Sequence, residues 1–166
     1  NKKPQDVPCE LDYIDAKVDR KLRKYAVARS RFAELAKKCP QDTQLKARYM
    51  DLLLATTLGD EASLPKFDAF VTDYPTHSFA DDVLIFKATM LLDKGRIDEG
   101  LASLARVIAQ YPQGDMINRA YFLQGFTWAK MGNTQSALTS FAELKKRNAQ
   151  DSLDFAQSAY WHARLS

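Results

Sequence analysis

Histidine, cysteine and carboxylate side chains are the groups from which this chain could build a catalytic or metal-binding site. The two histidines, His77 and His162, lie in different halves of the sequence, and neither is near a cysteine. Thiol catalysis needs a cysteine beside a histidine, and Cys9 and Cys39 have no such neighbour in sequence. The sequence contains no His-x-x-x-His motif, no Cys-x-x-Cys motif and no glycine-rich phosphate loop. We therefore predict no metal site and no cofactor.

Two pairs of neighbouring carboxylates, Asp81–Asp82 and Asp98–Glu99, have the residue types of a general acid and base. Both pairs stand where helices are expected to begin, and acidic side chains interact favourably with the helix dipole there. This structural role explains the carboxylates without catalysis. We therefore predict that the chain is not an enzyme.

Small and large residues repeat along the chain with a period of about 35 residues. Each copy has the order small, large, small, large at similar offsets. The two clearest copies are Ala88, Leu91, Gly100, Leu104 and Gly125, Trp128, Ala137, Phe141. A repeat of this length cannot bury its apolar face alone, so neighbouring units must stack on one another. The small residues are expected where the two helices of a unit approach most closely.

Apolar residues at helical spacing, interrupted by proline and glycine, predict pairs of antiparallel helices. The expected hairpins are residues 9–40, 44–75, 79–112 and 115–149, with a terminal capping helix at 153–165. Residues 1–8 are expected to form a flexible segment, and residues 9–166 a single domain. The predicted fold class is all-α, a right-handed α-solenoid of about four helix-turn-helix hairpins. In the first helix the apolar face consists of Leu11, Ile14, Val18 and Leu22.

This pattern resembles the tetratricopeptide-repeat (TPR) proteins over nearly the whole length of the chain. The third and fourth hairpins carry the resemblance best. The first two depart from it at Asp19 and Asp51, where the family pattern has apolar residues. The resemblance implies a non-catalytic scaffold that binds a protein or peptide partner.

Two linkers and the C-terminal segment carry narrower resemblances. The linkers Thr72–Asp81 and Gln110–Asp115 are similar to those of bacterial envelope repeat proteins, including barrel-assembly lipoproteins and periplasmic partners of the Tol–Pal system. The segments Gly125–Phe141 and Ala159–Arg164 resemble the helical superhelix of soluble lytic transglycosylases. Both imply a periplasmic or cell-envelope protein of bacteria. They leave open, as the alternative function, an accessory, peptidoglycan-associated region of a lytic transglycosylase whose catalytic domain is absent from this chain.

The two cysteines flank the first hairpin. Cys9 precedes its first helix and Cys39 follows its second, and antiparallel helices bring those two ends together. We predict a Cys9–Cys39 disulfide, with two unrelated thiols as the alternative. A disulfide would indicate an oxidising compartment such as the periplasm.

The first helices of stacked hairpins line a concave face, and the repeat predicts which positions point into it. These positions are Tyr13, Lys17, Arg20, Arg48, Leu52, Ile85, Thr89, Asp93, Arg119, Phe122, Phe126 and Lys130. Aromatic and aliphatic residues interleaved with basic ones suit an extended peptide with acidic or C-terminal carboxylate character. The alternative is that Ile85, Phe122 and Phe126 are ordinary core residues.

The net charge is +3, with basic residues concentrated in the first 50 residues. These basic residues belong either to a solvated helix end or to a contact for an acidic partner or an anionic surface. No RNA-binding aromatic motif accompanies them, so we expect no nucleic-acid partner. No apolar run is long enough to span a bilayer. Self-association through the ends of the repeat array is a further hypothesis. Because the chain begins at Asn1 without methionine, a membrane anchor upstream of Asn1 stays open.

Overall fold

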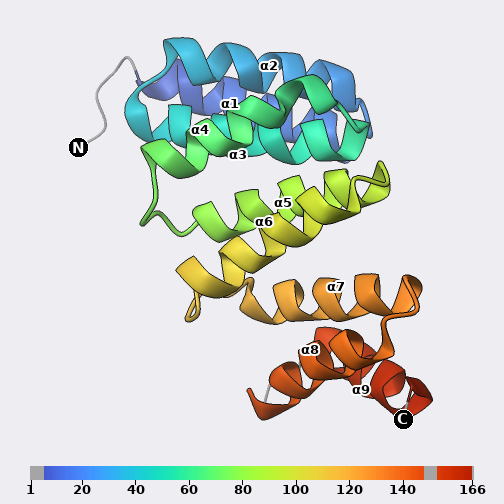
Figure 1. The fold of residues 1–166 in the computed structure, drawn as a ribbon. Coiled ribbons are helices and arrows are strands. Elements are labelled where there is room, and N and C mark those ends of the chain that lie inside the picture. The colour runs from blue at the N-terminus through green and yellow to red at the C-terminus, as the bar shows by residue number, and fades with distance from the viewer. Residues whose placement is uncertain (1–5, 148–152, 166) are drawn as a thin grey trace. The chain divides into compact units, whose positions relative to one another are not determined.

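The computed structural model describes residues 6–147 and 153–165, and the regular elements in these ranges are all helical (Figure 1). They are α1 (Asp6–Lys21), α2 (Tyr25–Lys38), α3 (Gln41–Leu58), the 3₁₀ helix η1 (Glu61–Ser63), α4 (Leu64–Asp73), α5 (Ala80–Asp93), α6 (Ile97–Gln110), α7 (Ile117–Lys130), α8 (Thr134–Lys146) and α9 (Leu153–Leu165). Within each of the two compact units of the chain, consecutive helices pack against one another, as in an α-solenoid. This confirms the predicted all-α repeat architecture.

The chain divides into two compact units, the N-terminal unit (residues 1–75) and the C-terminal unit (residues 76–166). In the N-terminal unit α1 packs on α2, and α2 packs on α3. Phe32 of α2 is fully buried in this core, and the ring of Tyr13 of α1 meets it edge-on with ring centroids 5.4 Å apart. Ala16 and Ala28 are also fully buried in this core, as expected of small residues at a close helix crossing.

A disulfide joins Cys9 of α1 to Cys39, the residue that directly follows α2. The two Cα atoms are 5.8 Å apart, because the antiparallel hairpin places the start of α1 beside the end of α2. The structure thus confirms the predicted pairing. Both cysteines of the sequence are used in this bridge.

Helix α1 begins at Asp6, earlier than the apolar spacing suggests. Pro8 is tolerated near its start because the first turn of a helix needs no backbone N–H donor. Residues 6–8 are therefore helical rather than part of the flexible segment expected at 1–8. Residues 1–5 lie outside the described residues.

The apolar face of α1 points to solvent, which corrects the expectation that an amphipathic helix buries this face. Its residues are between 48% and 61% exposed, and they are Leu11, Ile14, Val18 and Leu22. The opposite face, with Ala16 and Tyr13, contacts α2 instead. Helical spacing predicts that α1 is a helix, but it does not say which side has a neighbour.

Asp19 and Asp51, the departures from the TPR pattern, are buried and ion-paired. Asp19 Oδ2 lies 3.1 Å from Nε of Arg31. Asp51 Oδ1 accepts a hydrogen bond of 2.8 Å from Nε of Arg29, and its second oxygen lies 3.3 Å from Nζ of Lys66. In the first two hairpins, buried ion pairs therefore occupy places where the repeat normally has apolar side chains.

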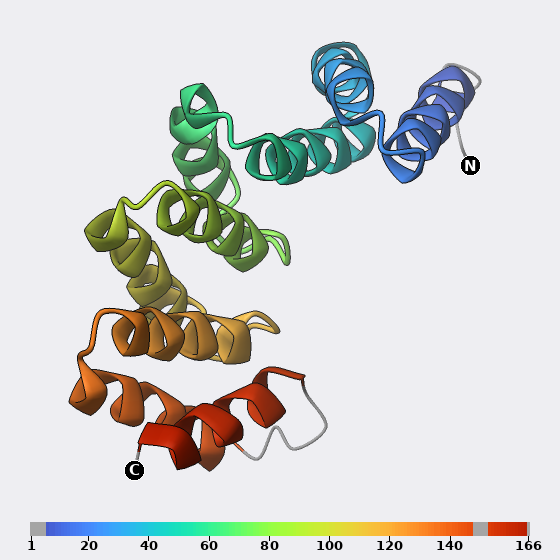
Figure 2. The ribbon, with the colours of Figure 1, turned by 90° about the vertical axis from the view of Figure 1, so that its right-hand side faces the viewer.

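In the C-terminal unit α5 pairs with α6, α7 pairs with α8, and α9 packs on both α7 and α8 (Figure 2). The turns within both hairpins contain a glycine at a φ of +76°, Gly95 and Gly132. This left-handed conformation is inexpensive only for glycine. Arg23 has a φ of 60° in the α1–α2 turn, so the first hairpin has a similar turn without the glycine.

Two further glycines let the helices of each hairpin approach closely. A Cβ atom at Gly125 of α7 would lie only 2.6 Å from Cε1 of Phe141 of α8. A Cβ atom at Gly100 of α6 would lie 2.6 Å from Cδ2 of Leu92 of α5. Both distances are shorter than any real carbon contact, which agrees with the expectation that small residues mark the helix crossings.

Replacing Gly125 with leucine is expected to lower the free energy of unfolding of the C-terminal unit by about 3 kcal/mol, because the new side chain overlaps the Phe141 ring. Urea denaturation followed by tryptophan fluorescence measures this, since both tryptophans, Trp128 and Trp161, lie in this unit. Ala105→Leu on the exposed side of α6 is the matched control, with an expected change below about 0.5 kcal/mol. Equal stability of the two variants would contradict the close crossing.

Candidate peptide-binding groove

Helix α7 lies between two open hollows of the C-terminal unit, which together form the α7 groove. The α5–α7 hollow, of about 290 Å³, is lined by Thr89 and Asp93 of α5 and by Phe126 and Lys130 of α7. All four residues belong to the predicted partner-binding set. Their side chains share this hollow because they come from the first helices of consecutive hairpins, which lie next to each other in a repeat array.

The α7–α9 hollow, of about 700 Å³, lies on the other side of α7. Arg119, Phe122 and Phe126 of α7 line it together with Tyr160 and Trp161 of α9. Phe126 borders both hollows, so it lies at the centre of the groove. All predicted residues of α5 and α7 except Ile85 thus line one or both of these hollows, while their role in binding stays a prediction.

An aromatic cluster forms the floor of the α7–α9 hollow. The rings of Phe122 and Phe126 are stacked with centroids 5.9 Å apart, and Trp161 meets Phe126 edge-on at 5.4 Å. These contacts leave Phe126 and Trp161 half-buried, whereas Phe122 is largely buried. Phe122 is therefore a core residue whose edge reaches the groove, as the alternative interpretation held, and Phe126 is a partly buried residue packed on that core.

Cationic groups lie over these aromatic rings. Lys130 Nζ is 5.7 Å from the centroid of Phe126, and the guanidinium of Arg119 is 5.6 Å from the centroid of Phe122. Such contacts orient the cations toward the groove at a gain of about 0.5–1 kcal/mol each at exposed sites. The groove therefore offers both apolar surface and positive charge.

Asp154 of α9 changes the charge of the groove in a way that the sequence did not predict. Its Oδ1 accepts a hydrogen bond of 2.9 Å from Nη1 of Arg119. This ion pair offsets the charge of Arg119 and leaves Lys130, which is exposed, as the more accessible cation of α7. The expected preference for an acidic peptide is therefore weaker here than the sequence suggests.

Several predicted groove residues lie elsewhere. Ile85 of α5 is 6% exposed and belongs to the core, because its side chain faces the interior of the C-terminal unit. Tyr13 of α1 packs on Phe32, and Lys17 lies over the Tyr13 ring at 5.9 Å from its centroid. Arg20 also belongs to α1, while Arg48 and Leu52 belong to α3, so these five residues are part of the N-terminal unit.

Tyr160 and Trp161 are groove residues that sequence reasoning missed. The sequence analysis assigns the terminal helix, residues 153–165, only a capping role. Because α9 packs on both α7 and α8, it occupies the place of the first helix of a further hairpin. The repeat pattern, if continued for one more unit after the fourth hairpin, would have placed the exposed side chains of α9 at the groove.

The carboxylates of Asp81, Asp82 and Asp115 lie within 4.8 Å of one another, but Asp81 has a structural role. Its Oδ2 accepts a hydrogen bond of 3.3 Å from the backbone N–H of Met116, just before α7. Burial raises the pKa of Asp81. This residue thus connects α5 to the start of α7, and we assign neither a metal nor a catalytic step to the trio.

The fold and the groove define an α-helical repeat protein whose successive first helices border an open surface. Residues 119–151, which include most of α7 and all of α8, match the family model of the tetratricopeptide repeat. No curated protein matches the chain. These findings support a TPR-like protein, a type that suggests a protein–protein interaction scaffold, and they do not support the narrower resemblance to particular envelope proteins. Within the described residues, no helix has the length and hydropathy of a membrane span.

Proposed function

We propose that this protein is a non-catalytic interaction scaffold that binds an extended peptide segment of a protein partner in the α7 groove. The observation that carries the proposal is the convergence of Phe126, Trp161 and Lys130 on one open surface. An extended peptide placed along α7 would set apolar side chains into the two hollows on either side of Phe126. Aromatic and cationic residues at the centre of an apolar patch are the usual source of binding energy in such sites.

We further propose that the scaffold works in the bacterial cell envelope. The Cys9–Cys39 disulfide supports an oxidising compartment outside the cytoplasm, since such bonds persist there and are rare in reducing compartments. The Tyr-Pro linkers that resemble those of periplasmic repeat proteins support the periplasm. Expression in the periplasm should therefore yield the oxidised protein.

Replacing Phe126 and Lys130 with alanine is expected to weaken peptide binding by about tenfold or more, because it removes the apolar centre and the accessible cation of the groove. Peptides selected from a phage-displayed random library on the intact protein provide the ligand, and isothermal titration measures the affinity. Phe126 also packs on Phe122 and Trp161, so the double variant is expected to lose some stability as well. Lys130→Glu, at an exposed position, tests the groove without that loss.

Lys145→Glu, on α8 outside the groove, changes the net charge by the same amount as Lys130→Glu and is its charge-matched control. It is expected to leave the affinity unchanged. If the selected peptides bind Lys130→Glu and the double variant as tightly as the original protein, the α7 groove is not the binding surface.

A further inference from the structure

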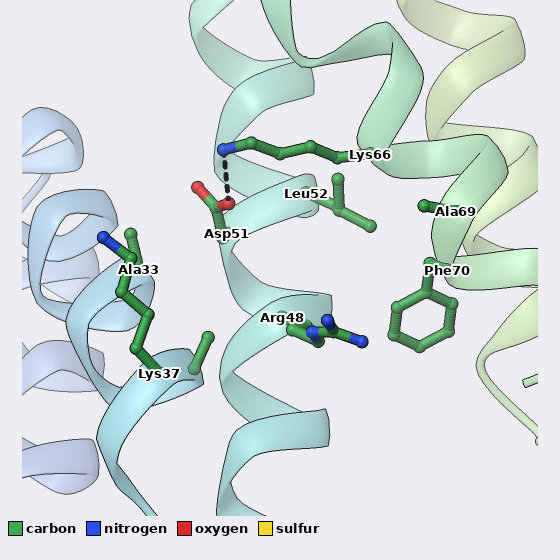
Figure 3. A pocket seen from close by; sticks show the side chains of 9 residues that line it. Ala33, Lys37, Arg48, Asp51, Leu52, Lys66, Ala69 and Phe70 are labelled. Carbon is green, nitrogen blue, oxygen red and sulfur yellow. Dashed lines mark hydrogen bonds and ion pairs between the residues drawn. The ribbon is translucent and has the colours of Figure 1, made fainter. Parts of the chain in front are cut away.

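A pocket of about 330 Å³, the α2–α4 pocket, lies within the N-terminal unit between α2, α3 and α4 (Figure 3). Its apolar wall consists of Ala33 and Ala36 of α2, Leu52 of α3 and Phe70 of α4. The small alanine side chains do not fill the space between the helices, so a hollow remains above α3. Its volume is sufficient for one or two side chains of a ligand.

Arg29 holds the helices that form this pocket. Its Nε donates a hydrogen bond of 2.8 Å to Asp51 of α3, and its Nη2 donates one of 2.5 Å to Oγ of Ser63 in η1. The same Nη2 lies 2.7 Å from Oδ2 of Asp60. These contacts tie α2 to α3 and to the turn that precedes α4. Hydrogen bonds between ionised groups are strong when partly buried, so the pocket is preorganised.

Three cationic side chains border the pocket, one from each helix: Lys37 of α2, Arg48 of α3 and Lys66 of α4. Figure 3 shows the Lys66 amine pointing at the Asp51 carboxylate, while the Lys37 side chain runs along α2. The charge of Asp51 is already offset by Arg29 and Lys66. Lys37 is exposed and makes no ion pair with the residues that the structure describes. Arg48 is paired with Asp73, whose Oδ2 lies 3.3 Å from Nη1 of the arginine. Lys37 therefore carries the uncompensated positive charge of the pocket.

We propose that the α2–α4 pocket binds an acidic segment of a partner protein. One large apolar side chain of the segment enters the pocket and covers Ala33, Ala36 and Ala69, while flanking carboxylates pair with Lys37 and Lys66. Charge complementarity favours this occupant, because Lys37 has no ion pair among the described residues and Lys66 shares the Asp51 carboxylate with Arg29. The concentration of basic residues in the first 50 residues of the chain favours approach of the same type of partner.

The apolar wall distinguishes this pocket from a patch that binds an anionic membrane. A membrane surface presents charge in a plane and does not fill a hollow lined by Leu52 and Phe70. A peptide side chain can enter it, and burial of that side chain against the accessible alanines of the pocket adds to the electrostatic attraction. The site is independent of the α7 groove, because its residues all belong to the N-terminal unit.

Fluorescence anisotropy on the intact protein tests the proposal with a labelled peptide that carries one phenylalanine flanked on both sides by glutamates. The combined substitution Lys37→Gln and Lys66→Gln is expected to weaken binding about tenfold, and Ala69→Phe, which fills the pocket from its exposed side, should weaken it by a similar factor. The control combines Lys94→Gln and Lys145→Gln, two exposed lysines of the C-terminal unit. It is expected to keep the original affinity.

Peptides with glutamine in place of glutamate, or alanine in place of phenylalanine, should each bind more weakly than the parent peptide. Equal affinity of the parent peptide for the original protein and for both pocket variants would overturn the proposal. Competition by phosphatidylglycerol vesicles that is lost in the Lys37→Gln, Lys66→Gln variant would assign the pocket to a membrane instead and would also overturn it. Lys130→Glu is expected to leave binding of the acidic peptide unchanged, so this site and the α7 groove can fail separately.

Discussion

Replacing Cys9 and Cys39 with serine is expected to lower the free energy of unfolding of the N-terminal unit by about 3–4 kcal/mol. The disulfide closes a loop with a sequence separation of 30 residues, and cross-linking a loop of this length restricts the unfolded chain by about that amount. The bridge matters more here than in a typical core, because α1 carries an exposed apolar face and is held mainly through its contacts with α2.

The location of the tryptophans allows the two units to be measured separately. Trp128 and Trp161 report on the C-terminal unit, and far-ultraviolet circular dichroism reports on all helices. In urea, the serine variant should show an earlier transition by circular dichroism while the tryptophan transition keeps its midpoint. Treating the original protein with a reducing agent should have the same effect, and treating the serine variant should have none. Unchanged circular dichroism transitions in both cases would show that the bridge does not stabilise the unit.

Local signals explain why the helical hairpins could be predicted from the sequence. Gly95 and Gly132 allow the left-handed turns, and Gly125 permits the close approach of α7 to α8. Each of these effects depends on the residue itself and on neighbours at a fixed distance in sequence. The pairing of Cys9 with Cys39 was predictable for a similar reason, because it follows from the antiparallel course of one hairpin.

Contacts that depend on which helix is the last of a stack could not be predicted in the same way. The residues Leu11 and Val18 have the spacing of a buried face, yet they are exposed because α1 contacts its neighbours through the other side. At the other end of the chain, α9 contributes Trp161 and Asp154 to the α7 groove. The spacing of apolar residues describes one helix at a time. It does not predict which helices a terminal helix contacts, or through which face.

Asp51 shows most clearly what the sequence could not reveal. In the repeat pattern it is only a misplaced polar residue, whereas in the structure it is buried and contacts Arg29 and Lys66 from two other helices. A carboxylate at such a position is tolerable only if distant cations neutralise it. The repeat pattern contains no information on those partners, because they come from positions that vary between repeats.

Replacing Arg29 with methionine is accordingly expected to lower the free energy of unfolding of the N-terminal unit by about 3 kcal/mol, since it leaves the Asp51 carboxylate buried with only Lys66 nearby. Hydrogen bonds from Ser63 and Arg29 also hold the pKa of Asp60 below its ordinary value. A lowered pKa in the folded state contributes stability above the unfolded pKa, and this contribution disappears as the pH falls through the folded pKa. The variant should therefore lose less stability on acidification than the original protein.

The experiment that separates the loss of charge pairing from the loss of packing combines Arg29→Met with Asp51→Leu. If the cost of Arg29→Met comes from an unpaired buried carboxylate, removing that carboxylate should restore much of the stability, because apolar replacements of a whole ion pair are often neutral. Urea denaturation followed by circular dichroism measures all three proteins, and the tryptophan transition of the C-terminal unit serves as the internal control. A double variant as unstable as Arg29→Met would mean that the arginine acts through Ser63 and Asp60, by holding the turn before α4, rather than through Asp51.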